Sequence, residues 1–233
     1  MAVGKVLSSL LASRRFALFA AILAFSALYP GGMSDARAQP AAGGPGAPRG
    51  VVQDFYDVLL GAMKDGRKLG FQGRFDRIRP AFEKAFNAPL MTRIVVGPGT
   101  WAAATPQQQE QAVEAFTRYS VANYAANFSD FGGERLELQG ERPTQAGTVV
   151  ETQIVPADDK PVAINFLLRP ADAGANTGMG GGWKITDVFL DRTISELATR
   201  RSDFARTIQD EGVAGLIRRL DEKTREIAAT TRQ

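Results

Sequence analysis

The apolar residues of this 233-residue chain change their spacing near residue 130, and that change limits the folds open to it. Before it they recur every three or four residues, which is the period of an amphipathic helix. After it, four segments alternate between apolar and polar residues, as strands with one buried face do. The helical period then returns. Helices followed by a group of strands and further helices predict an α+β domain.

Six helices are expected. They cover about 51–66, 74–86, 87–95, 105–128, 193–210 and 213–228. The sharpest start is at Thr105, which can cap its helix while Pro106 takes the first helical position and Gln108 completes a capping box. Pro80 predicts a kink or a boundary in the second helix, and Gly212 separates the last two.

Four strands are expected, at 134–139, 148–155, 162–168 and 183–190. Short turns join the first three, so we expect an antiparallel meander, with a glycine-rich loop at 171–182 before the fourth strand. The predicted fold is a curled antiparallel sheet of about four strands, covered on one face by helices. Such layers can leave a cavity between sheet and helices.

The N-terminus has the pattern of an export signal. Lys5, Arg14 and Arg15 precede an apolar run from Phe16 to Tyr29, and Ala36-Arg37-Ala38 offers a cleavage site before Gln39. The run is shorter than the ~20 residues that span a bilayer. We expect residues 1–38 to be a cleaved secretory signal for export to the periplasm, with an uncleaved membrane anchor as the alternative.

Ordinary Sec export is favoured, although "SRRFALF" is similar to a twin-arginine signal whose Phe stands one place too early. The chain has no cysteine, so anchoring through a lipidated Cys is excluded. Residues 39–50, rich in Pro, Gly and Ala, predict a flexible linker. Residues 51–233 then form a single domain, since no second linker and no repeat follows.

The formal charge excludes nucleic acid as a partner. Residues 1–38 hold four basic residues and one acidic residue, so their removal takes the net charge from +3 to zero. A neutral chain has no overall field to hold a phosphate backbone.

The chain also has no histidine. Without His and Cys it cannot build Ser-His-Asp or Cys-His catalytic sites, and it lacks the ligands of most transition-metal sites. No catalytic residue, metal or cofactor is expected. The closest carboxylate pairs, Asp54 with Asp57, Asp158 with Asp159 and Asp187 with Asp191, leave a carboxylate-based hydrolase as an alternative function.

Two apolar stripes are candidates for the walls of a binding pocket. The helical stripe consists of Phe116, Tyr119, Tyr124 and Phe128, with Trp101 expected to close one end. The strand stripe consists of Val150, Ile154, Ile164, Phe166 and Phe189. For any single residue, filling of the core is the more common explanation, so the evidence lies in the set as a whole. A pocketless interaction module with a solid core is therefore a second alternative, although two tyrosines on an apolar face favour a ligand-bearing edge.

The last two helices carry paired arginines, Arg200-Arg201 and Arg218-Arg219. They are either solvated surface or contacts to an acidic partner or a lipid headgroup. We treat them as candidate docking residues.

Four segments together resemble the MlaC or toluene-tolerance family of periplasmic lipid-binding proteins. They are "FDRIRPAFEKAFNAPLMTRIVVGPGTWAAATPQQQEQAVEAF", "YSVANYAANFSDF", "GGWKITDVFLD" and "RRSDFARTIQDEGVAGLIRRL". The resemblance covers Val51 to about Lys223. Its most specific elements are the W-x-x-ATP-x-Q run and W-K-[IV]-x-D-V followed by a helix with R-x-x-F.

The chain departs from the family after the W-K strand. Members typically carry Gly-Val-Ser-Leu there and Tyr-Arg in the next helix, where this chain has residues 191–197 and Arg200-Arg201. The sequence of this segment resembles that of the hopanoid-biosynthesis-associated branch, HpnM.

The resemblance implies a soluble carrier that shelters a phospholipid or a hopanoid in a lipid-sized cavity between sheet and helices. It would be the soluble component of an ABC-type lipid transport system. It also implies two partners, an inner-membrane Mla-type transporter complex and an outer-membrane-associated lipoprotein. The pocket and docking residues named above would serve these contacts.

Overall fold

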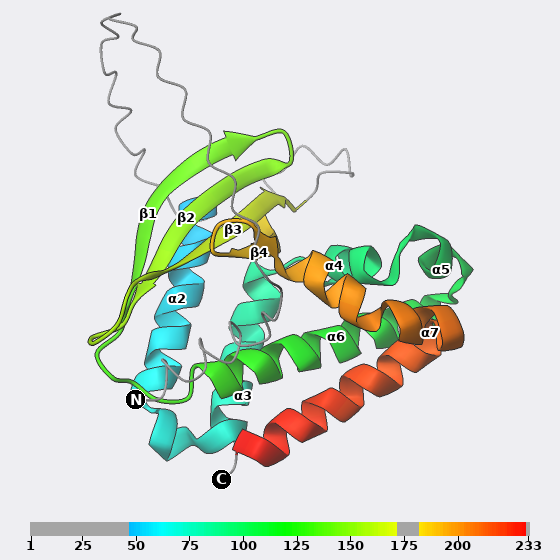
Figure 1. The fold of residues 1–233 in the computed structure, drawn as a ribbon, viewed down its shortest axis with the longest axis horizontal. Helices are drawn as coiled ribbons and strands as arrows, with labels where there is room; N and C mark the ends of the chain where they lie inside the picture. The colour runs from blue at the N-terminus through cyan, green and yellow to red at the C-terminus, as the bar shows by residue number, and fades with distance from the viewer. Residues whose placement is uncertain (1–46, 172–181, 232–233) are drawn as a thin grey trace, which may run out of the picture.

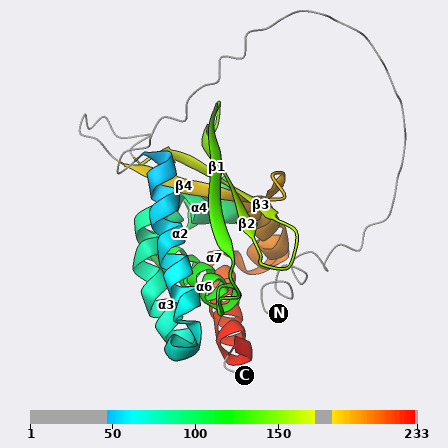
Figure 2. The ribbon, with the colours of Figure 1, turned by 90° about the vertical axis from the view of Figure 1, so that its left-hand side faces the viewer.

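The computed structural model describes residues 47–171 and 182–231. An open, five-stranded antiparallel sheet lies against a layer of helices, as Figures 1 and 2 show from two sides. The predicted α+β architecture is confirmed. The expected signal at 1–38, most of the linker and most of the 171–182 loop lie outside the described residues.

Six helices form in the described part of the chain. They are α2 (Pro48–Lys64), α3 (Gly66–Ala85), α4 (Ala88–Val96), α5 (Pro98–Ala103), α6 (Pro106–Asn127) and α7 (Glu196–Thr231). The predicted capping box at Thr105 is present, and Asn87 caps α4. The backbone N–H of Gln108 donates to Thr105 Oγ1 while its side chain accepts from the Thr105 N–H, and Asn87 Oδ1 accepts from the Leu90 N–H.

The starts of α2 and α3 differ from the prediction, and α5 is an additional helix. Helix α2 begins at Pro48, inside the expected linker, and α3 begins at Gly66 rather than near residue 74. Gly70 interrupts α3 with a positive φ of 61°, which a glycine adopts without steric cost, whereas Pro80 lies inside the helix. Helix α5 was not predicted, because the Gly-Pro-Gly sequence before it reads as a stop; Pro98 instead occupies its first position.

Helix α7 contains the two helices expected at 193–210 and 213–228. Gly212, with φ of 64° and ψ of −157°, breaks the run as predicted. The first of the two begins at Glu196, three residues later than expected, because the preceding residues form an additional short strand.

The strands run in chain order across the sheet. They are β1 (Arg135–Thr144), β2 (Gly147–Val155), β3 (Val162–Pro170), β4 (Trp183–Leu190) and β5 (Ile194–Ser195). Strand β5 was not predicted. It is only two residues long. In the turn before it, the non-glycine residues Asp191 and Arg192 have positive φ, which cannot be predicted from their residue types.

The register of β4 corrects one expectation about the sheet. Leu167 pairs with Asp187 but Leu168 pairs with Ile185, so Thr186 is an extra residue in β4. A bulge of this kind shifts the alternation of side chains by one position. Val188 and not Phe189 therefore shares the face of Ile185, so the prediction that Phe189 belongs to the strand stripe is wrong.

The core lies between the helix-facing side of the sheet and helices α2, α3, α4, α6 and α7. Phe55 and Phe86 meet edge to face, with ring centroids 5.0 Å apart. The turn between α3 and α4 is tied to the sheet, since the Asn87 N–H donates to the Ile185 carbonyl at 2.8 Å. Within the two described ranges, no helix is both long enough and apolar enough to cross a membrane.

A buried arginine joins α3 to α6. Arg74 donates from Nε to the carbonyl of Ala125 and from Nη1 to the carbonyl of Gly66, each at 2.8 Å. The side chain is buried, and the Ala125 carbonyl is one of the last four of α6, which have no partner within their helix. Arg74 thus fixes the position of the end of α6 relative to α3.

Replacing this arginine should destabilise the fold. Arg74→Met keeps the length of the side chain but removes two hydrogen bonds from a charged donor, each worth ~1.5–3 kcal/mol. We expect the free energy of unfolding to fall by about 3 kcal/mol in urea denaturation followed by circular dichroism. Arg67→Met, at a side chain that is 90% exposed, is the control and should change it by less than ~0.5 kcal/mol. Equal unfolding midpoints for the two variants would contradict this role.

Candidate functional site

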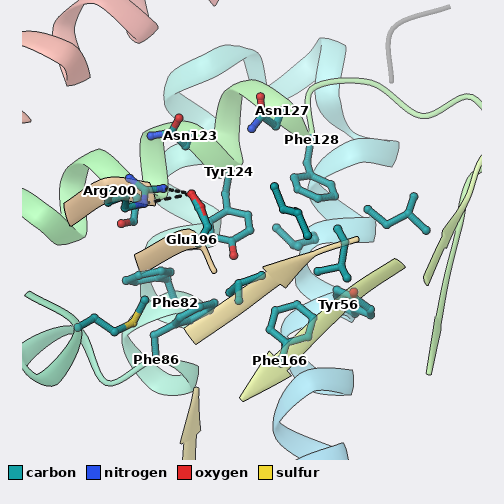
Figure 3. A pocket seen from close by; sticks show the side chains of 17 residues that line it. Tyr56, Phe82, Phe86, Asn123, Tyr124, Asn127, Phe128, Phe166, Glu196 and Arg200 are labelled. Carbon is teal, nitrogen blue, oxygen red and sulfur yellow. Dashed lines mark hydrogen bonds and ion pairs between the residues drawn. The ribbon is translucent and has the colours of Figure 1, made fainter. Parts of the chain in front are cut away.

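A pocket opens between the sheet and the helix layer, and Figure 3 shows its lining from close by. The cavity volume is about 140 Å³, within a hollow of about 1050 Å³ that includes the part open to solvent. The lining residues are Tyr56, Leu59, Phe82, Phe86, Met91, Ser120, Asn123, Tyr124, Asn127, Phe128, Ile154, Ile164, Phe166, Val188, Leu190, Glu196 and Arg200.

The sheet supplies an apolar wall. Ile154 of β2, Ile164 and Phe166 of β3, and Val188 and Leu190 of β4 all project from the helix-facing side. Their register explains why, because Ile164 pairs with Leu190 and Phe166 pairs with Val188 across neighbouring strands. Alternation along each strand sends these branched and aromatic side chains into the same space.

Aromatic rings from two helices close one side of the pocket. Phe82 and Phe86, one turn apart near the end of α3, stack with centroids 4.2 Å apart. Tyr124 of α6 lies edge to face with the core residue Phe55 at 5.1 Å and stacks with Phe128 at 5.9 Å. Rings packed in this way hold one another in place, so the wall is rigid where it meets the pocket.

Two tyrosines line the pocket, and their hydroxyl groups differ. Tyr56 OH lies 2.5 Å from Thr152 Oγ1, and the Thr152 hydroxyl donates its hydrogen to the carbonyl of Ile164. Tyr56 must therefore be the donor to Thr152. The Tyr124 hydroxyl has no hydrogen-bond partner among the described residues and points into the pocket (Figure 3). Burial raises the pKa of both phenols well above the ordinary value, so both stay protonated.

One ion pair lies in the lining, where α7 begins. Arg200 Nη2 and Nε donate to Glu196 Oε1 at 2.7 and 3.1 Å, and the arginine side chain is only 13% exposed. Burial alone would lower the pKa of Arg200, but the Glu196 carboxylate outweighs it and the net direction is upward. The pair is i, i+4 on the helix, the spacing at which side chains meet.

Five of the predicted pocket residues line the pocket. They are Tyr124, Phe128, Ile154, Ile164 and Phe166. The other five do not: Trp101, Phe116, Tyr119, Val150 and Phe189.

The reasons for the five exceptions are geometric. Phe116 and Val150 lie in the core with no exposed surface. Tyr119 faces α7, where its ring packs against Phe204 at 6.0 Å. Trp101 belongs to α5 and packs against the core, so it does not wall the pocket as expected. Phe189 lies on the opposite face of the sheet because of the bulge in β4.

The four arginines do not form one group. Arg200 lines the pocket, which corrects its expected place on a docking surface: the spacing of Leu197, Arg200 and Phe204 puts it on the inner face of α7. Arg201 is exposed. Arg218 and Arg219 form ion pairs at the surface with Glu211 and Glu222.

Sequence reasoning missed the contributions of α2, α3, α4 and α7 to the pocket. Phe82 and Phe86 were visible as a helical stripe, but a stripe does not say whether it meets a core or a cavity. Glu196 carried a usable signal. An acid placed i, i+4 before an arginine on an apolar helix face indicates a buried pair, because neither charge is stable there alone.

The candidate carboxylate pairs lie outside the pocket. Asp54 pairs with Lys84 at the surface, and Asp159 accepts a backbone N–H in a turn. Asp187 has a structural role, since it accepts from the Ser195 hydroxyl and from the Leu197 N–H at the start of α7. Across the part of the chain that the structure describes, no three acidic, Cys or His residues lie close enough together to hold a metal ion.

A search of solved structures finds a similar fold. It is a phospholipid-binding protein from Ralstonia solanacearum, solved in complex with a phospholipid, with 23% sequence identity and a TM-score of 0.64. The match covers 76% of this chain and 97% of that one. A search of curated protein sequences finds no match.

A sequence model of a known family, described as MlaC protein, matches residues 53–222. The match spans most of the chain, including strands β1 to β4 and every residue that lines the pocket. The chain therefore belongs to the MlaC family.

Proposed function

We propose that this protein is a periplasmic lipid carrier, the soluble component of an ABC-type lipid transport system that moves lipid between inner- and outer-membrane complexes. The observation that carries the proposal is the pocket itself. A chain of this length could close a solid core, yet an apolar space lined by aliphatic and aromatic side chains separates its two layers.

The chemistry of the lining supports binding rather than catalysis. Of the pocket residues, Glu196 is the only carboxylate, and Arg200 already holds it. A glycosidase-type mechanism needs two carboxylates facing one substrate, and the second is missing from this lining. Shelter of hydrocarbon needs no reactive group, because each buried methylene contributes ~0.8 kcal/mol.

The comparisons support the same function. Proteins of the MlaC family are periplasmic in general, and the similar Ralstonia protein binds a phospholipid. An N-terminal signal at residues 1–38 would deliver this chain to the periplasm. We propose a phospholipid or a hopanoid as the cargo; the HpnM-like wording of residues 191–201 supports the second.

Filling the pocket should abolish lipid loading. Ile164→Trp places a large ring in the space between β3 and α6, whereas Ala163→Trp adds the same bulk to the other face of the strand. Displacing as few as two methylenes weakens binding about tenfold, by ~0.8 kcal/mol each. Native mass spectrometry of protein purified from a membrane-containing host should show bound lipid in the wild type and in Ala163→Trp, and at least tenfold less in Ile164→Trp.

Bare polypeptide in the wild type would remove the main support for the carrier function. Equal loading of Ile164→Trp and Ala163→Trp would leave the protein a lipid binder but would place the lipid elsewhere. Circular dichroism of both variants establishes that they fold.

We further propose that the outer surface of α7 docks to the two membrane-associated partners. A lipid does not leave an apolar pocket for water quickly, so handover needs a partner that binds the open state more tightly. Arg201, Arg218 and Arg219 are the candidate contacts, now without Arg200, because arginine suits recognition of carboxylates on a partner.

The triple variant Arg201→Gln, Arg218→Gln, Arg219→Gln should slow lipid transfer between donor and acceptor complexes several-fold without changing loading. A charge-matched control replaces the exposed Arg67, Arg135 and Arg142, on α3 and β1, with Gln. Transfer is measured with a fluorescent lipid. If both triples transfer at the wild-type rate, the three arginines have no part in docking.

A further inference from the structure

The polar groups of the pocket are concentrated where α7 meets α6. Figure 3 shows the Tyr124 hydroxyl directed into the pocket, with Glu196 and Arg200 beside it. Ser120, Asn123 and Asn127 of α6 also line the pocket, and the Asn123 amide donates to the Tyr119 carbonyl at 2.7 Å. The rest of the lining is aromatic or apolar. Charged side chains in such surroundings cost free energy unless each is paired, so their bonding partners define what else could bind there.

The positive charge of Arg200 is already paired with the Glu196 carboxylate. Its Nε and Nη2 donate to Glu196 Oε1, and its guanidinium carbon lies over the rings of Tyr119 at 4.7 Å and Phe116 at 5.8 Å. Arg200 Nη1 is buried without a hydrogen-bond partner among the described residues. The electron-rich faces of the two rings compensate for that, since a guanidinium over an aromatic face is attracted to it.

Two groups beside Arg200 do lack a partner. Glu196 Oε2 is buried and accepts no hydrogen bond from the described residues. The Tyr124 hydroxyl, which stays protonated, can both donate and accept. An unsatisfied buried polar group destabilises the protein, and more so if it is charged, so a ligand that supplies a donor here is bound more tightly.

The electrostatics do not favour an anionic group at this place. The charges in the lining are one carboxylate and one guanidinium, bound to each other, so a phosphate would meet Glu196 without a free cation. The N-terminus of α7 offers no substitute. The Leu197 N–H donates to Asp187 Oδ1 at 3.2 Å, and the Ala198 N–H donates to Ser195 Oγ at 3.0 Å.

We infer that Tyr124 and Glu196, with Arg200 holding the carboxylate in place, form a subsite for a hydroxyl group on the bound lipid. A hydroxyl carries no charge, donates to the carboxylate and accepts from the phenol. The ligand class is a lipid whose apolar body carries an alcohol, either the free hydroxyl of a diglyceride or an alcohol on a polycyclic lipid. The inference rests on the proposed function, since it requires that the pocket holds a lipid.

Matched lipids test the subsite. The delipidated full chain is titrated with dioleoylglycerol, its 3-acetyl ester and dioleoyl phosphatidic acid, which share their tails, and with a sterol and its acetate. Native mass spectrometry gives the affinities. A free hydroxyl should improve binding about tenfold over the acetyl ester in the pair that fits the subsite, and phosphatidic acid should bind more weakly than dioleoylglycerol. The pair that shows the difference identifies the source of the hydroxyl.

Two variants distinguish the contribution of the Tyr124 hydroxyl from that of the Glu196 carboxylate. Tyr124→Phe keeps the ring and the ion pair, and should bring the free alcohol and its ester within about twofold of each other. Glu196→Gln leaves Arg200 without a counter-charge and should shift the preference towards phosphatidic acid by at least tenfold. Glu211→Gln, an exposed position on the same helix, is the control and should change neither ratio.

Three results would overturn the inference. Equal affinities for alcohol and ester in both pairs would exclude a hydroxyl subsite. A wild-type preference for phosphatidic acid would make the site an anion site instead. Failure of every lipid to bind would refute the proposed carrier function itself, whereas binding of all lipids with no preference would leave that function intact.

Discussion

The pocket depends on a mismatch between the shapes of two packed layers. The sheet bends where β1 and β4 each carry a bulge, while α6 runs without interruption from Pro106 to Asn127. A continuous helix cannot follow a curled sheet along its whole length, because bulges increase the twist and bend of the strands that contain them. The layers therefore touch where the core forms and separate at the pocket.

The walls of this space are kept apart by contacts that lie outside it. Arg74 ties the end of α6 to α3, the N–H of Asn87 bonds the carbonyl of Ile185 in β4, and Phe55 packs against the ring of Tyr124. Close-packed interiors normally remove a void, since its lining loses dispersion contacts. In this protein the pocket stays open despite the lost dispersion contacts, and a hydrocarbon ligand would restore them.

The sequence predicts the layers well and the pocket only in part. The spacing of apolar residues alone locates most helices and the four longer strands. It also assigns Tyr124, Phe128 and Phe166 correctly to the walls of the pocket. Period fails at Phe189, because one inserted residue in β4 inverts the alternation and no residue type marks the insertion. It also leaves Arg200 ambiguous, since a charged side chain suggests the surface until its partner Glu196 is recognised on the same face. Which stripes meet a core and which meet a cavity depends on tertiary packing.

The position of the bound lipid is the most direct test of the proposed pocket. A crystal structure of the protein loaded with a lipid whose acyl chains carry bromine would locate those chains by anomalous scattering. We expect bromine peaks between the sheet wall of Ile164 and Phe166 and the ring of Tyr124, with the backbone of the protein close to that of the present structure. Peaks at the outer face of the sheet, or a pocket closed by its own side chains while lipid is bound elsewhere, would contradict it.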